Sequence, residues 1–230
     1  MYRNNSITLF IILAIITSAC SKKVVRTAAA ETKTYLALGD SYTIGQGVQP
    51  TERFPFLLAA TLRNEGIPLA EPRYIATSGW TTLNLQNAIE SENPPSTFDL
   101  VTLLIGVNDQ YQFRDTTGYR LRFAQLLTKA ITLAKGRMER VFVLSIPDYS
   151  ATPFVPPSDK QRVRTQIDQF NTINKDVTVN RGVTYVDITP LTREVVNDPS
   201  LLANDQLHYS RKEHLEWVKL LVPLVRERLK

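Results

Sequence analysis

Short apolar runs alternate with longer amphipathic segments along most of this chain. Each run has the length of one buried strand, and each segment between two runs has the length of a helix. This alternation is typical of β-α-β units, in which the strands pair in parallel and helices cover the sheet. It predicts strands at residues 34–38, 73–76, 100–105, 141–145 and 183–187. It predicts helices at residues 54–63, 82–90, 119–134, 158–177 and 211–229.

The segment at residues 158–177 carries the clearest helical pattern. Its apolar residues recur three, four or seven positions apart, which keeps them on one face of a helix. They are Val163, Ile167, Phe170 and Val177. The alternation as a whole therefore predicts an α/β domain built on a parallel sheet.

Composition narrows the possible functions. The 230 residues carry a formal net charge of +5, which is spread along the chain rather than massed in one segment. Such a distribution gives little support to nucleic-acid binding. The single cysteine excludes an intramolecular disulfide. The length suits one domain with a sizeable core, and we expect a monomer.

The N-terminal segment has the order of a secretory signal. Arg3 lies in a polar stretch, an apolar run follows at residues 7–16, and small residues lead to Cys20. The apolar run is shorter than an ordinary membrane-spanning helix. The segment resembles a bacterial lipoprotein signal, which implies removal of residues 1–19 and lipidation of Cys20. The protein would then be anchored to a membrane of the bacterial cell envelope, facing the periplasm or the exterior.

Two alternatives for this segment are a plain secretory peptide and an uncleaved anchor. In the lipoprotein interpretation, residues 20–32 form a tether and residues 33–230 form the folded domain.

Glycines and polar residues follow the predicted strands. In an open parallel sheet, ligands bind outside the carboxyl ends of the strands. We therefore expect these loops to meet at one edge of the sheet. The loop at residues 147–157 is rich in proline and is long enough to border a site. The sequences after the first four strands are GDS at 39–41, SGW at 78–80, GVND at 106–109 and PDYSATPFVPP at 147–157.

A serine at such an edge needs a base before it can act as a nucleophile. His208 lies three residues after Asp205, so one turn can direct the carboxylate of Asp205 at the imidazole. The carboxylate would fix the tautomer of His208 and leave the other ring nitrogen to take the proton of Ser41. The second histidine, His214, falls in the charged start of a predicted helix, and we expect it to be a solvated surface residue.

Acyl transfer also needs donors for the developing oxyanion. Gly79 can bring its backbone N–H close because it has no side chain, Ser41 supplies its own N–H, and the Asn108 amide is a third donor. Each feature alone has a simpler explanation, since glycine after a strand is often a turn and Asn-Asp is often a cap. Their common placement at strand ends favours catalysis.

Four blocks of the chain together resemble the SGNH (GDSL) hydrolase family of esterases and lipases. They are GDSY at 39–42, the glycine of SGW at 79, GVND at 106–109 and DQLH at 205–208. The resemblance runs from about residue 34 to the C-terminus, in the family order. It implies a flavodoxin-like three-layer α/β/α sandwich with a five-stranded parallel sheet. It also implies a catalytic Ser41, Asp205 and His208, with an oxyanion hole formed by Ser41, Gly79 and Asn108.

Other residues near these blocks receive structural interpretations. Tyr42 replaces the leucine of the family name and changes the pocket beside the nucleophile, while Asp40 is a turn-former and Asp109 is structural. The aromatic residues Trp80, Tyr111 and Phe154 either form the walls of the pocket or pack the loops down. No motif has metal-ligand or phosphate-loop spacing, which predicts a hydrolase without metal or cofactor. The G-x-S-x-G motif of the α/β-hydrolases is absent.

These observations predict a serine esterase that hydrolyses carboxylic esters through an acyl-enzyme. Its substrate would be a small-molecule or polysaccharide ester. Lysophospholipase or thioesterase activity and carbohydrate O-acetylesterase activity both remain open. A surface lipoprotein that binds ligands without catalysis is the alternative from another class, although a binding module would not require the whole Ser, Gly, Asn and His set.

Overall fold

The computed structural model describes Met1, residues 31–112 and residues 115–230. Apart from Met1, the predicted signal peptide lies outside the described residues, as do Cys20 and most of the predicted tether. Within the described residues, no helix is both long enough and apolar enough to cross a membrane.

One sheet forms the centre of the folded domain. Its strands within the described residues are β1 (Tyr35–Gly39), β2 (Arg73–Ala76), β3 (Leu100–Leu104), β4 (Val141–Leu144) and β5 (Thr184–Val186). They lie in the order β2-β1-β3-β4-β5, and every neighbouring pair is parallel. This is the flavodoxin-like order. The predicted five-stranded parallel sheet is confirmed.

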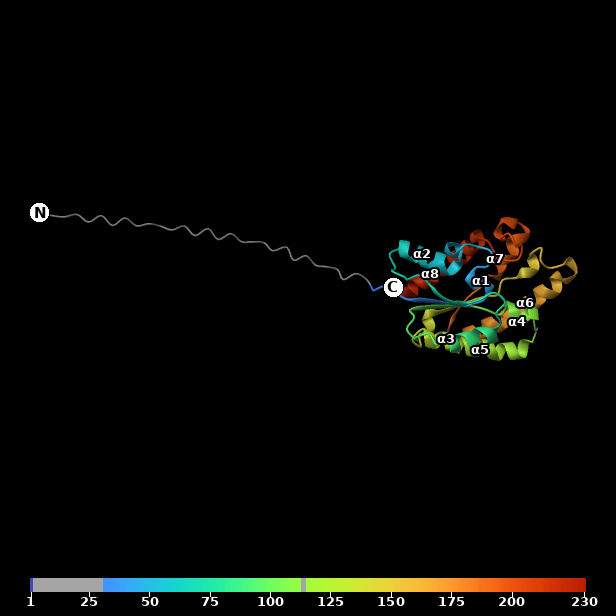
Figure 1. Cartoon of the computed structure of the whole chain (residues 1–230), viewed down its shortest axis with the longest axis horizontal. Helices are drawn as coiled ribbons and strands as arrows, with labels where there is room; N and C mark the ends of the chain where they lie inside the picture. Colours follow the sequence, from blue (N-terminus) through green and yellow to red (C-terminus); the bar gives the residue numbers. More distant parts are fainter. Residues whose placement is uncertain (2–30, 113–114) are drawn as a thin grey trace. The chain divides into compact units, whose positions relative to one another are not determined.

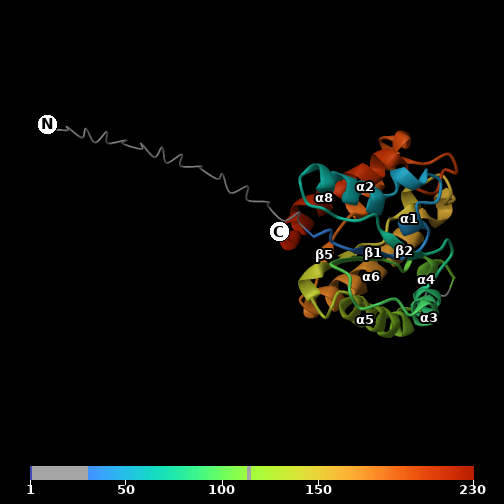
Figure 2. The same ribbon diagram turned by 60° about the vertical axis from the view of Figure 1, so that its left-hand side comes forward.

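Helices cover both faces of the sheet (Figures 1 and 2). One face carries α1 (Ser41–Ile44), α2 (Phe54–Asn64), α7 (Thr189–Thr192) and α8 (Arg211–Leu229). The other carries α3 (Thr82–Glu92), α4 (Val107–Gln112), α5 (Thr116–Leu133) and α6 (Pro157–Asn180). The predicted three-layer sandwich is therefore confirmed.

The central strands are apolar because both of their faces are covered. All residues of β1, β3 and β4 are buried. In a parallel sheet with helices on both sides, such strands are continuous apolar runs rather than alternating ones. The largest buried side chains include Tyr35 on β1, Tyr119 and Phe123 on α5, and Trp217 on α8.

The five long helices agree with their predicted ranges to within a few residues. α8 has the predicted bounds and continues through Pro223. α5 begins three residues before its predicted start because the Asp115 side chain accepts hydrogen bonds from the Thr117 and Gly118 N–H groups. The short helices α1, α4 and α7 were not predicted, nor were the 3-10 turns η1 (Pro50–Glu52), η2 (Met138–Arg140), η3 (Tyr149–Ala151), η4 (Arg193–Val196) and η5 (Pro199–Leu201).

The prediction that His214 is a solvated surface residue is wrong. Its side chain is 1% exposed, stacks on the Trp217 ring at a centroid distance of 4.7 Å, and lies between α2 and α8. Its Nδ1 accepts a hydrogen bond of 2.8 Å from the Phe54 N–H, a donor at the N-terminus of α2 that has no partner within the helix. Burial lowers the pKa of His214 to about 3. The histidine is therefore a neutral part of the core.

Replacing His214 should destabilise the protein. His214→Ala removes the packing on Trp217 and leaves the Phe54 N–H without its acceptor, so we expect a loss of about 2–4 kcal/mol of unfolding free energy. Glu227→Ala, at an exposed position of the same helix, should change it by less than about 0.5 kcal/mol. Chemical denaturation at neutral pH measures both.

The same pair of proteins gives a pH dependence with a defined sign. The native state keeps His214 neutral, so its contribution is complete above the unfolded pKa of 6.5 and is lost as the pH falls towards 3. The stability difference between wild type and His214→Ala should shrink below pH 6.5 by up to about 1.4 kcal/mol per pH unit. A small difference that does not change with pH would restore the surface interpretation.

Candidate active site

Ser41 is the first residue of α1, directly after β1. The turn between them requires a glycine, because a Cβ at Gly39 would overlap the Thr43 side chain and the Leu104 carbonyl oxygen. Gly45, at φ 67°, ends α1 in the left-handed conformation. The glycines around Ser41 therefore fold the chain tightly at both ends of this one-turn helix.

Asp40 forms the predicted turn beside Ser41. Its side chain caps α1 by accepting a hydrogen bond of 3.0 Å from the Tyr42 N–H. Burial raises the pKa of Asp40 to about 8, although the Tyr42 N–H opposes that rise. At neutral pH the carboxyl group is thus mostly protonated, and it places little negative charge beside Ser41.

Asp205 and His208 form the predicted pair. The Asp205 Oδ2 lies 2.7 Å from the His208 Nδ1, and its Oδ1 accepts a hydrogen bond from the His208 N–H. Burial acts to raise the pKa of Asp205, but the hydrogen bonds from His208 and Leu207 outweigh it and hold the pKa below its usual range. An ionised carboxylate on Nδ1 leaves Nε2 of His208 as the nitrogen that can accept a proton.

A short loop at residues 202–209 holds Asp205 and His208 close to the segment that follows α1. An antiparallel bridge joins Leu202 to Tyr209 at the base of the loop, and the Ala203 N–H donates to the His208 carbonyl oxygen at 2.8 Å. The loop packs close to Gly47, where a Cβ would come within 2.7 Å of the Ala203 side chain. Gly47, at φ 88°, therefore lets the loop approach the segment that follows α1.

Tyr42 is the residue that departs from the family name. Its ring is buried, with its centroid 5.6 Å from that of His208 and 5.7 Å from that of Tyr209. The larger side chain thus packs against the imidazole of His208 and also lines the cavity beside Ser41.

Asn108 lies on α4, directly beyond β3. Its Nδ2 donates a hydrogen bond of 2.9 Å to the Trp80 carbonyl oxygen. An amide nitrogen carries two donors, so one N–H is bonded to Trp80 and the second can bind an oxyanion.

The neighbouring Asp109 is structural, as predicted. Its carboxylate accepts hydrogen bonds from the Thr82 N–H at 2.8 Å and the Thr82 hydroxyl at 2.6 Å, and it pairs with Arg122. Burial raises the pKa of Asp109, and the hydrogen bonds from Thr82 and Arg122 oppose the rise. Asp109 and Asn108 together fasten the loop after β2 to the end of β3.

A cavity of about 150 Å³ brings three of the predicted site residues together. Ser41, Asn108 and His208 line it with apolar and aromatic side chains from several loops. No hydrogen bond joins the Ser41 and His208 side chains among the described residues. A hydrogen bond between a nucleophile and its base is often long in the absence of substrate and tightens on binding. The other lining residues are Tyr42, Val107, Tyr111, Tyr149, Phe154 and Leu207.

Gly79 lies in the exposed turn after β2 and has a φ of 82°. It is not among the residues that line the cavity. Its carbonyl oxygen accepts a hydrogen bond from Gln112 on α4 at 3.2 Å. Its place in the oxyanion hole stays a prediction.

The aromatic residues divide between the two predicted roles. Tyr111 and Phe154 line the cavity, whereas Trp80 packs against the core and offers its carbonyl oxygen to Asn108. Tyr149 is a wall that the sequence analysis did not identify. It follows Asp148 in the proline-rich loop, and its place in that loop was the only sign in the sequence that it could lie at the site.

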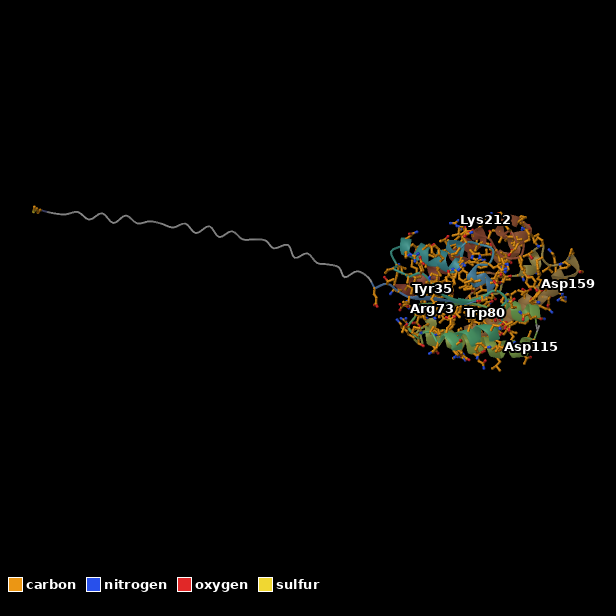
Figure 3. The ribbon with its side chains drawn as sticks, viewed as in Figure 1. Tyr35, Arg73, Trp80, Asp115, Asp159 and Lys212 are labelled. Carbon is orange, nitrogen blue, oxygen red and sulfur yellow. The ribbon has the colours of Figure 1, made fainter. Side chains whose placement is uncertain are left out.

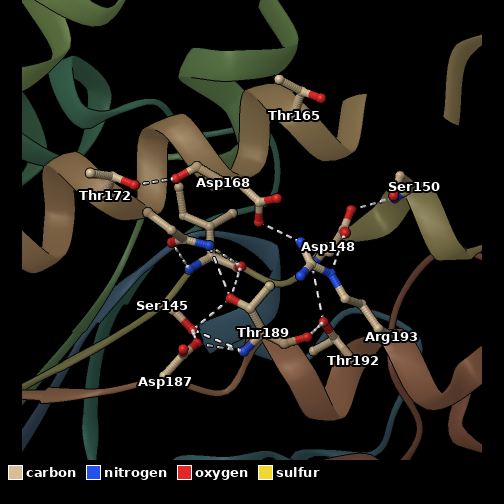
Figure 4. A network of polar contacts seen from close by, with 12 residues as sticks. Ser145, Asp148, Ser150, Thr165, Asp168, Thr172, Asp187, Thr189, Thr192 and Arg193 are labelled. Carbon is tan, nitrogen blue, oxygen red and sulfur yellow. Dashed lines mark hydrogen bonds and ion pairs between the residues drawn. The ribbon is translucent and has the colours of Figure 1, made fainter. Parts of the chain in front are cut away.

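Figure 4 shows how the proline-rich loop is held. The Asp148 side chain is fully buried, accepts from the Ser150 N–H at 3.0 Å and pairs with Arg193 Nε at 2.7 Å. A buried carboxylate needs such partners to offset its lost hydration. The Tyr209 hydroxyl donates to the Asp148 carbonyl oxygen at 3.3 Å. The network therefore links the loop that carries Tyr149 to the residue next to His208.

Within residues 31–112 and 115–230, no group of three or more His, Cys, Asp or Glu side chains is placed to hold a metal ion. The absence of a cofactor stays a prediction from the sequence.

The fold and the strand-end residues define the class of the protein. A flavodoxin-like sheet with a serine after β1, an asparagine after β3 and an Asp-x-x-His loop before the last helix is the arrangement of an SGNH hydrolase. The model of the GDSL-like lipase/acylhydrolase family matches residues 37–214. The chain belongs to this family, and it is a carboxylic ester hydrolase.

Solved structures of esterases share the fold. The psychrotrophic esterase EstA from a Pseudoalteromonas species is 18% identical, with a TM-score of 0.63 over 86% of this chain and 98% of that one. Phospholipase A1 from Streptomyces albidoflavus is 19% identical, with a TM-score of 0.65 over 86% and 100% of the two chains. The acetylxylan esterase Axe2 from Geobacillus stearothermophilus is 20% identical, with a TM-score of 0.61 over 86% and 94%. A search of curated protein sequences gave no match.

Asn108→Ala should reduce turnover. If its second N–H binds the oxyanion, kcat falls by roughly a hundredfold to a thousandfold, or about 3–4 kcal/mol, while KM changes much less. Asn108→Asp should be at least as poor, because a carboxylate would face the oxyanion. Steady-state kinetics and melting temperatures on the same samples test this.

Asn171→Ala provides a matched control for Asn108. This amide also donates to a loop carbonyl oxygen, that of Ile146 at 2.9 Å, and Asn171 does not line the cavity. It should lower the melting temperature and leave kcat near normal. If Asn108→Ala behaved in the same way, Asn108 would be a structural tie between loops rather than an oxyanion donor.

Proposed function

We propose that this protein is a serine esterase that hydrolyses carboxylic esters of short acyl groups through an acyl-enzyme on Ser41. One observation carries the proposal. Ser41 and His208 line one cavity, and Asp205 orients the imidazole from its far side.

The residues support a two-step reaction. His208 Nε2 takes the proton of Ser41 as Oγ attacks the ester carbonyl, and the Ser41 N–H and Asn108 amide bind the resulting oxyanion. The imidazolium, stabilised by Asp205, gives its proton to the departing alcohol. Water then attacks the acyl-enzyme with His208 again as base, which releases the carboxylic acid and restores Ser41.

The size of the cavity favours a short acyl group. An enclosed site of about 150 Å³ accepts a ligand the size of benzene, or roughly six non-hydrogen atoms. The cavity here has a similar volume, although it is partly open to solvent, and its walls include Val107, Leu207 and aromatic rings. These properties favour acetyl to about pentanoyl esters over long-chain lysophospholipids or acyl thioesters.

Hydrolysis of p-nitrophenyl esters from acetyl to palmitoyl tests the proposal. We expect kcat/KM to be highest for the shortest chains and to fall as the chain outgrows the cavity. Ser41→Ala and His208→Ala should lower kcat by roughly a thousandfold or more. Ser96→Ala, at an exposed position before β3, should not. Activity that increases towards palmitoyl would contradict the short-acyl preference, and no hydrolysis at all would favour a binding protein.

We also propose that a lipid on Cys20 anchors the mature protein in the cell envelope. The supporting pattern is the apolar run at residues 7–16 followed by small residues and the single cysteine. Cys20→Ser should abolish incorporation of labelled fatty acid, impair processing and reduce partitioning into the detergent phase. Unchanged labelling of the variant would refute the anchor. A plain secretory protein would be soluble with either residue.

A further inference from the structure

Asp40 binds most of the backbone donors of the one-turn helix that carries Ser41. Its side chain accepts a hydrogen bond of 3.0 Å from the Tyr42 N–H. Its carbonyl oxygen accepts hydrogen bonds from the Thr43 and Ile44 N–H groups, at 3.1 and 2.9 Å. Three of the four N–H groups of α1 are therefore bonded to Asp40. The fourth, that of Ser41, is the one that Asp40 leaves to another acceptor.

The carboxyl group of Asp40 is buried without a cation. The side chain is 0% exposed, and its Oδ2 has no hydrogen-bond partner within the described residues. None of the ion pairs that these residues form includes it. A buried carboxylate without a cation is costly, whereas a neutral carboxyl group loses much less hydration. This environment therefore favours the protonated acid.

The charged and titratable groups on the neighbouring helices do not offset this effect. Burial raises the pKa of Asp40 to about 8, and the negative charge of Asp109 on α4 adds to the rise. The Arg122 side chain on α5 pairs with Asp109 and not with Asp40. Tyr42 on α1 and Tyr119 on α5 stay neutral, because burial holds the pKa of each hydroxyl well above its usual value.

Two loops complete the surroundings. The loop before α8 contributes His208 and Tyr209, whose ring centroids lie 5.6 and 5.7 Å from that of Tyr42. The loop after β4 contributes Asp148, whose charge is taken by an arginine of η4. His208 is neutral when it acts as the base. An ionised Asp40 would therefore add a negative charge that these loops do not compensate.

We propose that Asp40 is a positioning residue of the esterase, which acts through the Ser41 N–H and does so only as a neutral acid. The inference rests on the proposed function. By binding the other three N–H groups of α1, Asp40 fixes the turn so that the Ser41 N–H is available to the oxyanion. A negative charge on Asp40, one residue before that N–H, would oppose the negative charge of the tetrahedral intermediate in a buried site. Ionisation of Asp40 thus slows turnover.

The pH dependence of turnover separates this role from that of a structural cap. With a histidine base alone, kcat rises to a plateau once the imidazole is neutral. Ionisation of Asp40 adds a fall on the alkaline side of that plateau, with its midpoint near pH 8. A structural cap gives no such fall, because an ionised aspartate caps a helix at least as well as a neutral one.

Hydrolysis of ethyl butyrate in a pH-stat tests the inference between pH 6 and 9.5. We expect the wild-type kcat to fall by about tenfold or more from pH 7 to pH 9.5, as Asp40 ionises. In Asp40→Asn the amide oxygen can keep the bond to the Tyr42 N–H, but the side chain cannot ionise. The fall within this variant should be less than about twofold. Melting temperatures at both pH values show whether each protein is folded.

Asp115→Asn is the matched control. Asp115 caps α5 through the same kind of bond, which it accepts from the Thr117 N–H two residues further on at 3.1 Å. It is exposed, does not line the catalytic cavity, and lies at the outer edge of the domain (Figure 3). Removing its charge should leave the alkaline fall as large as in wild type.

The outcomes separate this inference from the proposed function. An equal alkaline fall in wild type and Asp40→Asn would overturn the inference and leave the esterase intact, as would a wild-type kcat that stays on its plateau to pH 9.5. A folded Asp40→Asn without turnover at any pH would also overturn it, because the neutral side chain would then not suffice. A wild type that hydrolysed no ester would remove the proposed function as well.

Discussion

The parallel pairing of β1 with β3 is the constraint on which the site depends. The two strands lie side by side with Gly39 opposite Leu104, although these residues are 65 positions apart in the chain. β2 pairs with the other edge of β1, so the connections leave β1 and β3 in opposite directions across the sheet. Such a switch point opens a crevice at the carboxyl ends of the strands. Ser41 follows one of these strands and Asn108 the other, and they line the same cavity.

Four aspartate side chains organise the loops around this crevice. Asp40, Asp148 and Asp205 each accept a hydrogen bond from a backbone N–H two or three residues further on. Asp109 instead accepts one from the Thr82 N–H, in the distant loop after β2. An aspartate that bonds its own turn fixes a loop without a long element to support it. The same kind of hydrogen bond thus has an additional role in two of these loops. At Asp205 it also orients a histidine, while at Asp148 it supports the aromatic wall of the cavity.

Much of this arrangement could be predicted from the sequence, for identifiable reasons. Strands buried on both faces are continuous apolar runs, so β1 and β3 were located to within a residue or two. Asp205 and His208 are three residues apart, and local spacing was enough to pair them. The short helix α1 was missed because one turn has no periodicity. His214 was misplaced because its burial depends on Phe54, far away in the sequence. Gly47 and Tyr149 matter through tertiary contacts with distant loops, which no local pattern indicates.

The proposed mechanism requires that His208 activates Ser41 to form the acyl-enzyme. Intact-protein mass spectrometry after treatment with a fluorophosphonate tests this activation, because the reagent modifies an activated serine and leaves ordinary serines unmodified. We expect one adduct on wild type, mapped to Ser41 by peptide analysis, and none on a folded Ser41→Ala variant. An adduct that persists in the folded Ser41→Ala variant, or that maps to another serine, would contradict it.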